Sequence, residues 1–189
     1  QEILSDFSDV SLDYWVSGYG TGGTVSGVGR VLREKSPGTK IILTEPENAA
    51  LIGSELKQDR HSDNTPATSH SSWNPHLIQG WTPDFIPFVL QEAIDNKYFD
   101  KLLPVSGEQG ITWAKRLARA EGIITGISGG STFAIAMEVA KDAPPDSNIL
   151  CMLPDTGERY LSSPLFEEIP EEMTDDEKKI SLSTPNYQL

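Results

Sequence analysis

A glycine-rich segment, Gly18-Tyr19-Gly20-Thr21-Gly22-Gly23-Thr24, constrains the fold of this 189-residue chain more than any other feature. The aromatic and β-branched run before it, residues 14–17, is typical of a strand. After it, apolar residues recur at helical spacing between Thr24 and Pro37, which predicts a helix. A second apolar, β-branched run follows at residues 40–44. The sequence therefore predicts a strand–loop–helix–strand unit, with a right-handed crossover and a parallel sheet.

This loop is suited to binding a phosphate group. Backbone N–H groups converge at a helix N-terminus, where the helix dipole favours negative charge. Gly20, Gly22 and Gly23 let the backbone approach a ligand closely, and the hydroxyls of Thr21 and Thr24 add donors. We predict that Gly20 to Thr24 bind a phosphate; a plain turn between strand and helix is the simpler alternative.

The same spacing also fits a dinucleotide-binding protein. Gly18-x-Gly20-x-x-Gly23 satisfies the dinucleotide fingerprint, and Glu45 ends the next strand at about the expected distance to hold a ribose. The two threonines favour a phosphate monoester over a bridging diphosphate, and Pro46 constrains the backbone of Glu45. Spacing alone leaves both ligands open, whereas no Gly-Lys-Ser/Thr is present for a Walker-type loop.

Strands and helices alternate through the rest of the chain, which predicts an α/β domain. Ser106 and Gln109 have the spacing of a capping box, and a second glycine turn, Ser128–Ser131, follows the predicted strand Ile123–Ile127. Ligands of such sheets bind beyond the C-terminal ends of the strands, where both glycine turns fall. The expected elements are helix 86–96, strand 102–105, helix 107–121, strand 123–127, helix 132–141 and strand 149–153.

The three histidines and the single cysteine do not predict a metal site. The spacing of His61, His70 and His76 fits no standard zinc pattern, and Cys151 is remote from them. We expect His61 and His70 to lie on the surface of the polar loop 59–74. Cys151 sits in an apolar run and is expected in the core. Because one thiol cannot form an internal disulfide, we expect a reducing compartment, the cytoplasm or an organelle matrix or stroma.

The formal net charge of −13 bears on the possible partners. A chain with more acidic than basic residues is not expected to bind nucleic acid or an anionic membrane surface. No apolar stretch approaches the length of a membrane span. Residues 167–189 are rich in acidic side chains and are expected to form a solvated tail beyond a domain at residues 1–166.

Five segments, in order, resemble cysteine synthase (O-acetylserine sulfhydrylase). This enzyme belongs to the fold-type-II pyridoxal-phosphate family, with tryptophan synthase β and cystathionine β-synthase. The resemblance implies the larger domain of that fold, an open, mostly parallel twisted sheet with helices on both faces. It covers only the C-terminal part of the family's chain. The matching segments are 17–30, 45–46, 75–80 with 85–87, 121–130 and 153–162.

The resemblance also implies roles for individual residues. Ser128 would hydrogen-bond the pyridine nitrogen of pyridoxal 5′-phosphate and leave it largely unprotonated, which suits β-elimination and replacement. Asp155 would lie near the edge of the pyridine ring. Gly80, Trp81 and Thr82 would border the substrate cleft, where many family members have smaller residues than Trp81. The cofactor phosphate would be held by Gly20, Thr21, Gly22, Gly23 and Thr24.

The lysine that forms a Schiff base with the cofactor is not recognisable in this chain. In the family it lies in the N-terminal part, and the lysines here occupy polar positions without the desolvated setting of an activated amine. We therefore expect no catalytic residue in this chain, and we expect it to be a fragment of a full enzyme.

The full enzyme is expected to make L-cysteine from O-acetyl-L-serine and sulfide. A cystathionine β-synthase-like enzyme and an inactive structural or interaction subunit are the alternatives. The implied partners are a small amino-acid substrate and a second copy in a homodimer, with serine acetyltransferase or a larger assembly as further candidates.

Overall fold

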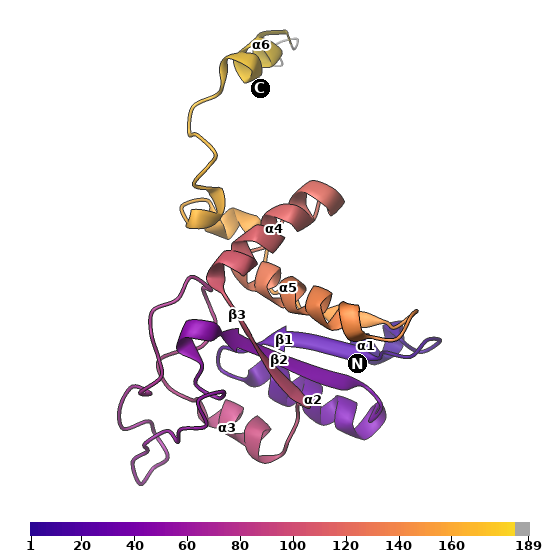
Figure 1. Ribbon diagram of the computed structural model, residues 1–189, viewed down its shortest axis with the longest axis vertical. Coiled ribbons are helices and arrows are strands. Elements are labelled where there is room, and N and C mark those ends of the chain that lie inside the picture. Colours follow the sequence, from indigo (N-terminus) through magenta and orange to yellow (C-terminus); the bar gives the residue numbers. More distant parts are fainter. Residues whose placement is uncertain (184–189) are drawn as a thin grey trace.

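The computed structural model describes residues 1–183. At its centre lies a four-stranded parallel sheet in the order β3-β2-β1-β4 (Figure 1). The strands are β1 (Tyr14–Gly18), β2 (Lys40–Pro46), β3 (Lys101–Val105) and β4 (Ile149–Cys151). All three neighbouring pairs are parallel, with Tyr14 opposite Lys40 and Ile149. The predicted α/β architecture is confirmed.

Helices cover both faces of this sheet (Figure 1). Successive strand residues point to opposite faces. Trp15 of β1 therefore packs in the core under α2 and α3, whereas Val16 packs in the core under α4 and α5. The helices are α1 (Glu2–Asp6), α2 (Gly23–Lys35), α3 (Phe88–Asp95), α4 (Gly107–Glu121), α5 (Ile127–Asp142) and α6 (Asp175–Ser183), with short 3-10 helices η1 (Glu47–Ala49), η2 (Gly157–Tyr160) and η3 (Pro164–Phe166).

The start of α4 carries the predicted capping box. The Ser106 hydroxyl accepts the Gln109 N–H at 3.1 Å, and the Ser106 N–H donates to Gln109 Oε1 at 3.0 Å. Two N–H groups that the first turn leaves unsatisfied are thereby paired. This prediction succeeded because the motif depends only on residues three apart.

The predicted strand Ile123–Ile127 is wrong. Residues 123–126 contain only an isolated bridge between Thr125 and Thr156, and α5 begins at Ile127, before the expected helix 132–141. The glycines after it belong to this helix: a Cβ on Gly130 would lie 2.0 Å from the Gly110 carbonyl oxygen of α4. Close packing of α4 on α5 thus needs glycine within a helix, where the sequence predicted a turn.

The polar loop 59–74 contains no helix or strand, in agreement with expectation, but one of its histidines is buried. His70 is only 4% exposed. Its Nδ1 accepts the Ser72 N–H at 3.2 Å, so the proton on Nε2 donates to the Leu56 carbonyl, also at 3.2 Å. The predicted surface position is therefore wrong for His70, whereas His61 is exposed.

Within the acidic tail, helix α6 stands apart from the sheet and its covering helices (Figure 1), whereas Glu168 pairs with Lys115 of α4 at 3.1 Å. Helix α6 buries no residue, and residues 184–189 lie outside the described part of the chain. The division into a domain at 1–166 and a tail at 167–189 remains a prediction.

Candidate cofactor site

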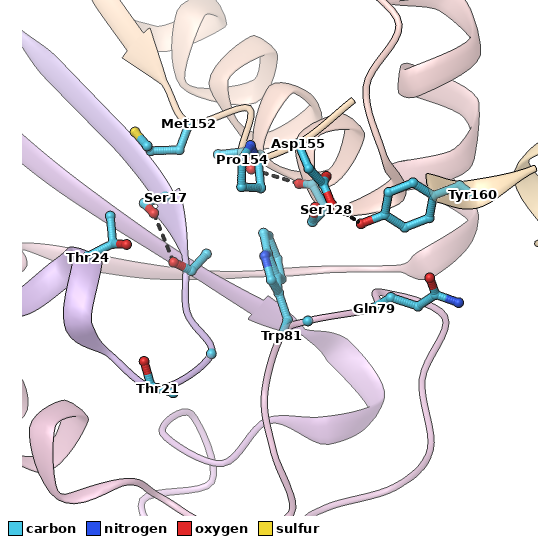
Figure 2. Close-up of a pocket in the computed structure, with 14 residues that line it drawn as sticks. Ser17, Thr21, Thr24, Gln79, Trp81, Ser128, Met152, Pro154, Asp155 and Tyr160 are labelled. Atoms are coloured by element: carbon cyan, nitrogen blue, oxygen red, sulfur yellow. Dashed lines mark hydrogen bonds between the residues drawn. The ribbon is translucent and has the colours of Figure 1, made fainter. Parts of the chain in front are cut away.

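A cavity of about 370 Å³ lies at the C-terminal end of β1 (Figure 2). It is bounded by the glycine loop, the start of α5, the segment around Trp81 and the chain that follows β4. Its volume is within the usual range for small-molecule and cofactor sites. The lining residues are Ser17, Gly18, Gly20, Thr21, Thr24, Gln79, Gly80, Trp81, Ser128, Thr132, Met152, Pro154, Asp155 and Tyr160.

One end of the cavity is formed by the start of α2. The Ser26 N–H donates the first backbone hydrogen bond of this helix, to the Gly22 carbonyl at 2.9 Å. The amides of Gly23, Thr24 and Val25 precede that bond and have no intrahelical acceptor. Among the described residues, the hydroxyl of Thr24 and that of the cavity-lining Thr21 have no protein hydrogen-bond partner. This set of donors fits a phosphate group.

The loop adopts a geometry that only small residues allow. Gly22 has φ 87°, in the left-handed region, and a Cβ there would lie 2.6 Å from Leu90 Cα. A Cβ on Gly20 would lie 2.5 Å from the Gly80 carbonyl oxygen. The two glycines therefore shape the loop and let it meet the segment at Gly80.

Glu45 does not face a ligand. The Tyr19 hydroxyl donates to its Oε2 at 2.5 Å, and the amides of Ile52 and Gly53 donate to Oε2 and Oε1 at 3.1 and 2.8 Å. The residue is 1% exposed. Burial raises the pKa of Glu45, opposed by these hydrogen bonds, and burial together with the Glu45 charge raises the pKa of Tyr19. The ribose-binding role that a dinucleotide site would give Glu45 is wrong.

The opposite end of the cavity carries Ser128, Tyr160 and Asp155. The Tyr160 hydroxyl donates to Asp155 Oδ2 at 2.9 Å (Figure 2). Burial and the bond to Asp155 raise the pKa of Tyr160. Asp155 Oδ1 is buried and has no hydrogen-bond partner among the described residues, which leaves an acceptor in the cavity wall. Such an orphaned atom fits a site built for a polar ligand.

The third wall contains Gly80 and Trp81. The Trp81 indole lies against Gly18, where a Cβ would come within 2.0 Å of the ring. Thr82, in contrast, is 1% exposed and does not line the cavity. Its amide donates to the Tyr19 carbonyl at 2.9 Å, and its carbonyl accepts the Trp73 indole N–H at 3.0 Å. Thr82 therefore anchors the segment from behind.

The cavity brings together most of the residues singled out in the sequence. Gly22 and Gly23 belong to the loop but do not line it, and none of the described lysines does. Sequence reasoning missed Tyr160, although it lies in the matching segment 153–162. The residues brought together are Gly20, Thr21, Thr24, Gly80, Trp81, Ser128 and Asp155.

Within residues 1–183, no group of three or more His, Cys, Asp or Glu side chains is placed to hold a metal ion. No helix in that range is long and apolar enough to cross a membrane.

The fold and the cavity define an α/β protein with a candidate ligand site at the C-terminal edge of a parallel sheet. Residues 1–155 match the family described as pyridoxal-phosphate dependent enzyme, and the chain belongs to this family. Its neighbours among solved structures have the fold-type-II architecture, and the cofactor of the family is pyridoxal 5′-phosphate.

The related proteins are longer than this chain. It is 40% identical to O-ureido-L-serine synthase of Streptomyces lavendulae over 97% of its own length and 50% of the relative. It is 41% identical to cysteine synthase B of Campylobacter jejuni over 87% of its length and 48% of the relative. A crystal structure of O-ureido-L-serine synthase superposes with a TM-score of 0.77 at 40% identity, covering 95% of this chain and 50% of that one. The chain thus spans about half the length of these relatives.

Proposed function

We propose that this chain forms the cofactor-binding part of a pyridoxal-phosphate-dependent enzyme that replaces a group on the β-carbon of an L-serine ester. The observation that carries the proposal is the single cavity at the end of β1. It joins the unpaired amides at the start of α2 to the polar group Ser128, Tyr160 and Asp155. A phosphorylated pyridine ring needs an anion site and a polar partner for its nitrogen, at opposite ends.

Several residues of the cavity have a defined task in this proposal. The amides and hydroxyls of the segment from Gly20 to Thr24 hold the phosphate, and Ser128 meets the ring nitrogen. When bound, the cofactor withdraws electrons from the α-carbon of an amino acid. Trp81 covers one side of the site and limits the access of water. The lysine that bonds the cofactor in this family is supplied from outside this chain.

The preferred reaction is that of cysteine synthase. O-acetyl-L-serine loses acetate from its β-carbon, and sulfide forms a bond to the same carbon, which gives L-cysteine. The cysteine synthases among the relatives support this choice. A cystathionine β-synthase-like reaction would use a larger thiol in place of sulfide. An inactive subunit with the same fold would lack the lysine.

A second candidate follows from the Streptomyces relative, whose name states that it makes O-ureido-L-serine. That product carries an oxygen nucleophile on the β-carbon in place of sulfur. This relative aligns over 97% of the chain at 40% identity, whereas the cysteine synthases align over 87% at 34% and 41% identity, which supports this candidate. Both reactions use the same cavity and differ in the nucleophile.

The test is a product analysis with the full-length protein and pyridoxal 5′-phosphate. O-acetyl-L-serine is supplied with sulfide, with hydroxyurea or with homocysteine, and the amino-acid products are separated and identified. Formation of L-cysteine as the fastest reaction supports the proposal, and faster formation of O-ureido-L-serine selects the second candidate. No replacement product with any nucleophile, in a protein that carries the cofactor, would overturn the proposed class.

The partners and the compartment belong to the same proposal. We expect a homodimer, with serine acetyltransferase or a larger assembly as further partners, in a reducing compartment such as the cytoplasm or an organelle matrix or stroma. Gel filtration with light scattering tests the dimer directly.

A further inference from the structure

Trp81 is the largest side chain that the segment 79–81 contributes to the cavity. Figure 2 shows its indole directed between the side of the cavity that carries Thr24 and the side that carries Ser128. The ring lies directly against the end of β1, because the three heavy atoms nearest to a Cβ built on Gly18 all belong to the indole. A glycine at position 18 is therefore needed to seat the tryptophan.

The backbone on both sides of Trp81 is held in place. Gly80 has φ 81° and Thr82 has φ 38°, so a non-glycine residue next to the indole adopts the left-handed region. Thr82 is 1% exposed; its amide donates to the Tyr19 carbonyl at 2.9 Å, and its carbonyl accepts the Trp73 indole N–H at 3.0 Å. Backbone strain of this kind persists only where the surroundings hold it. Together with its seat at the end of β1, this makes the indole a rigid part of the cavity wall.

The indole limits the space that is left for a reacting nucleophile. In the proposed function the cofactor extends from the phosphate donors near Thr24 to Ser128, and the serine-derived substrate shares the same cavity of about 370 Å³. A nucleophile that attacks the β-carbon has to fit into the remaining space. Because Gly18 and Gly80 carry no side chain, the bulk of Trp81 sets the boundary on this side. A small side chain at position 81 would leave a recess over Gly18.

We propose, on the basis of the proposed function, that Trp81 is a specificity-determining residue: it admits small nucleophiles, such as sulfide or hydroxyurea, and excludes thiols that carry a whole amino acid, such as homocysteine. Steric exclusion requires a wall that does not yield, and the anchored backbone at Gly80 and Thr82 provides it. A difference of one methylene group in a pocket is worth about 10–200-fold in kcat/KM. The cystathionine β-synthase-like reaction is thereby excluded.

The first measurement compares nucleophiles. Full-length wild type, Trp81→Ala and Trp81→Phe, each loaded with pyridoxal 5′-phosphate, receive O-acetyl-L-serine with homocysteine or with the faster of sulfide and hydroxyurea. The ratio of kcat/KM for homocysteine to kcat/KM for the small nucleophile is expected to be low in the wild type. It is expected to rise by about tenfold or more in Trp81→Ala and by less in Trp81→Phe, which keeps an aromatic ring. Trp113→Leu, which changes a half-buried tryptophan of α4 outside the cavity, is the matched control and should leave the ratio unchanged.

The second measurement does not depend on turnover. Equilibrium binding to the loaded proteins gives their affinities for L-cysteine and for L-cystathionine, the products formed from the small and the large thiol. The wild type is expected to bind L-cystathionine much more weakly than L-cysteine. Trp81→Ala is expected to narrow this difference by about tenfold or more, and Trp113→Leu should not change it.

The outcomes separate this inference from the proposed function. A wild type that uses homocysteine as well as the small nucleophile would overturn the inference and leave the proposed class of enzyme intact. So would a folded Trp81→Ala with the wild-type ratio and the wild-type difference in affinity. If Trp81→Ala does not fold, Trp81→Leu takes its place with the same expectation, and the wild-type ratio remains decisive. A wild type that takes up no cofactor, or forms no replacement product with any nucleophile, would overturn the proposed function and this inference together.

Discussion

The hydroxyl of Tyr19, inside the glycine loop, donates a hydrogen bond to Glu45 at the end of β2 over 2.5 Å. This bond joins the loop to the next strand, and the amides of Ile52 and Gly53 complete the environment of the carboxylate. A carboxylate with three internal donors, in a residue 1% exposed, is a structural anchor. In a dinucleotide-binding protein, the residue at the position of Glu45 would hold a ribose. In this protein Glu45 holds the glycine loop in place.

Removal of the Tyr19 hydroxyl should therefore weaken the fold. In Tyr19→Phe, Glu45 Oε2 keeps only the Ile52 amide, and we expect a loss of about 1–3 kcal/mol in the free energy of unfolding. Urea denaturation measures this loss. Tyr98→Phe removes a half-buried tyrosine hydroxyl with no hydrogen bond among the described residues, and it should change stability little. Equal losses in both variants would contradict the anchoring role.

Glu45 should also make stability depend on pH. Burial raises its pKa, so the folded state retains a proton that the unfolded state releases near the ordinary value of about 4.3. This contribution is fully present below that value and is lost as the pH rises through the raised pKa of the folded state. Unfolding free energies measured across this range should fall with pH in the wild type. In Glu45→Gln this component of the slope should disappear; an unchanged slope would assign it to other groups.

The contact between Gly110 and Gly130 predicts a severe effect of a single methyl group. A Cβ on Gly130 would lie 2.0 Å from the Gly110 carbonyl oxygen, so Gly130→Ala should destabilise the protein by about 1–3 kcal/mol or more. Gly27→Ala is the matched control, because this helical glycine of α2 has no atom within 4 Å of the added Cβ. We expect Gly27→Ala to stabilise by roughly 0.5–1 kcal/mol. Thermal unfolding of both variants checks the pair, and a neutral Gly130→Ala would contradict the close helix packing.

Cys151 should react slowly with alkylating reagents. Burial in β4 raises the pKa of its thiol, so the reactive thiolate is scarcer at neutral pH than in an unfolded chain. Mass spectrometry after timed treatment with iodoacetamide should show slow labelling of the folded protein and fast labelling in denaturant. Comparable rates in the two states would show that the thiol is accessible.

The sequence predicts those features that depend on near neighbours. The unit β1, α2 and β2 follows from a local alternation of apolar runs and glycines, and the capping box of Ser106 and Gln109 depends on one helical turn. The prediction of a strand at Ile123–Ile127 was wrong because the structure there depends on residues that are distant in the sequence. The β-branched residues of this segment favour a strand, but α5 is fixed by its packing on α4, where Gly130 meets Gly110, a residue 20 positions earlier in the chain.

In the candidate site, too, features set by neighbouring residues could be predicted and features set by distant residues could not. Gly20, Thr21 and Thr24 could be predicted because the residues expected to bind phosphate lie in one continuous loop. The hydrogen bonds of Glu45 to Tyr19 and to the amides of residues 52 and 53 could not be predicted. They depend on a turn of the chain after β2 that the sequence pattern does not reveal. Tyr160 was missed because its approach to Asp155 depends on η2, which bends the chain back.

Gly23 offers a way to test whether the glycine loop binds the phosphate of pyridoxal 5′-phosphate. Gly23 has no positive φ, and a Cβ there would meet only Thr21 Oγ1, at 3.7 Å, so a side chain is accommodated. An acidic residue at a helix start also favours the helix. Gly23→Asp should therefore fold normally but repel the phosphate.

The decisive measurement is equilibrium binding of pyridoxal 5′-phosphate and of pyridoxal to the full-length wild type, Gly23→Asp and the neutral control Gly23→Asn. We predict that the wild type binds the phosphorylated form much more tightly, that Gly23→Asp loses this preference, and that Gly23→Asn retains most of it. Equal affinity of the wild type for both ligands, or a Gly23→Asp protein that keeps the wild-type preference, would contradict the assignment of the loop.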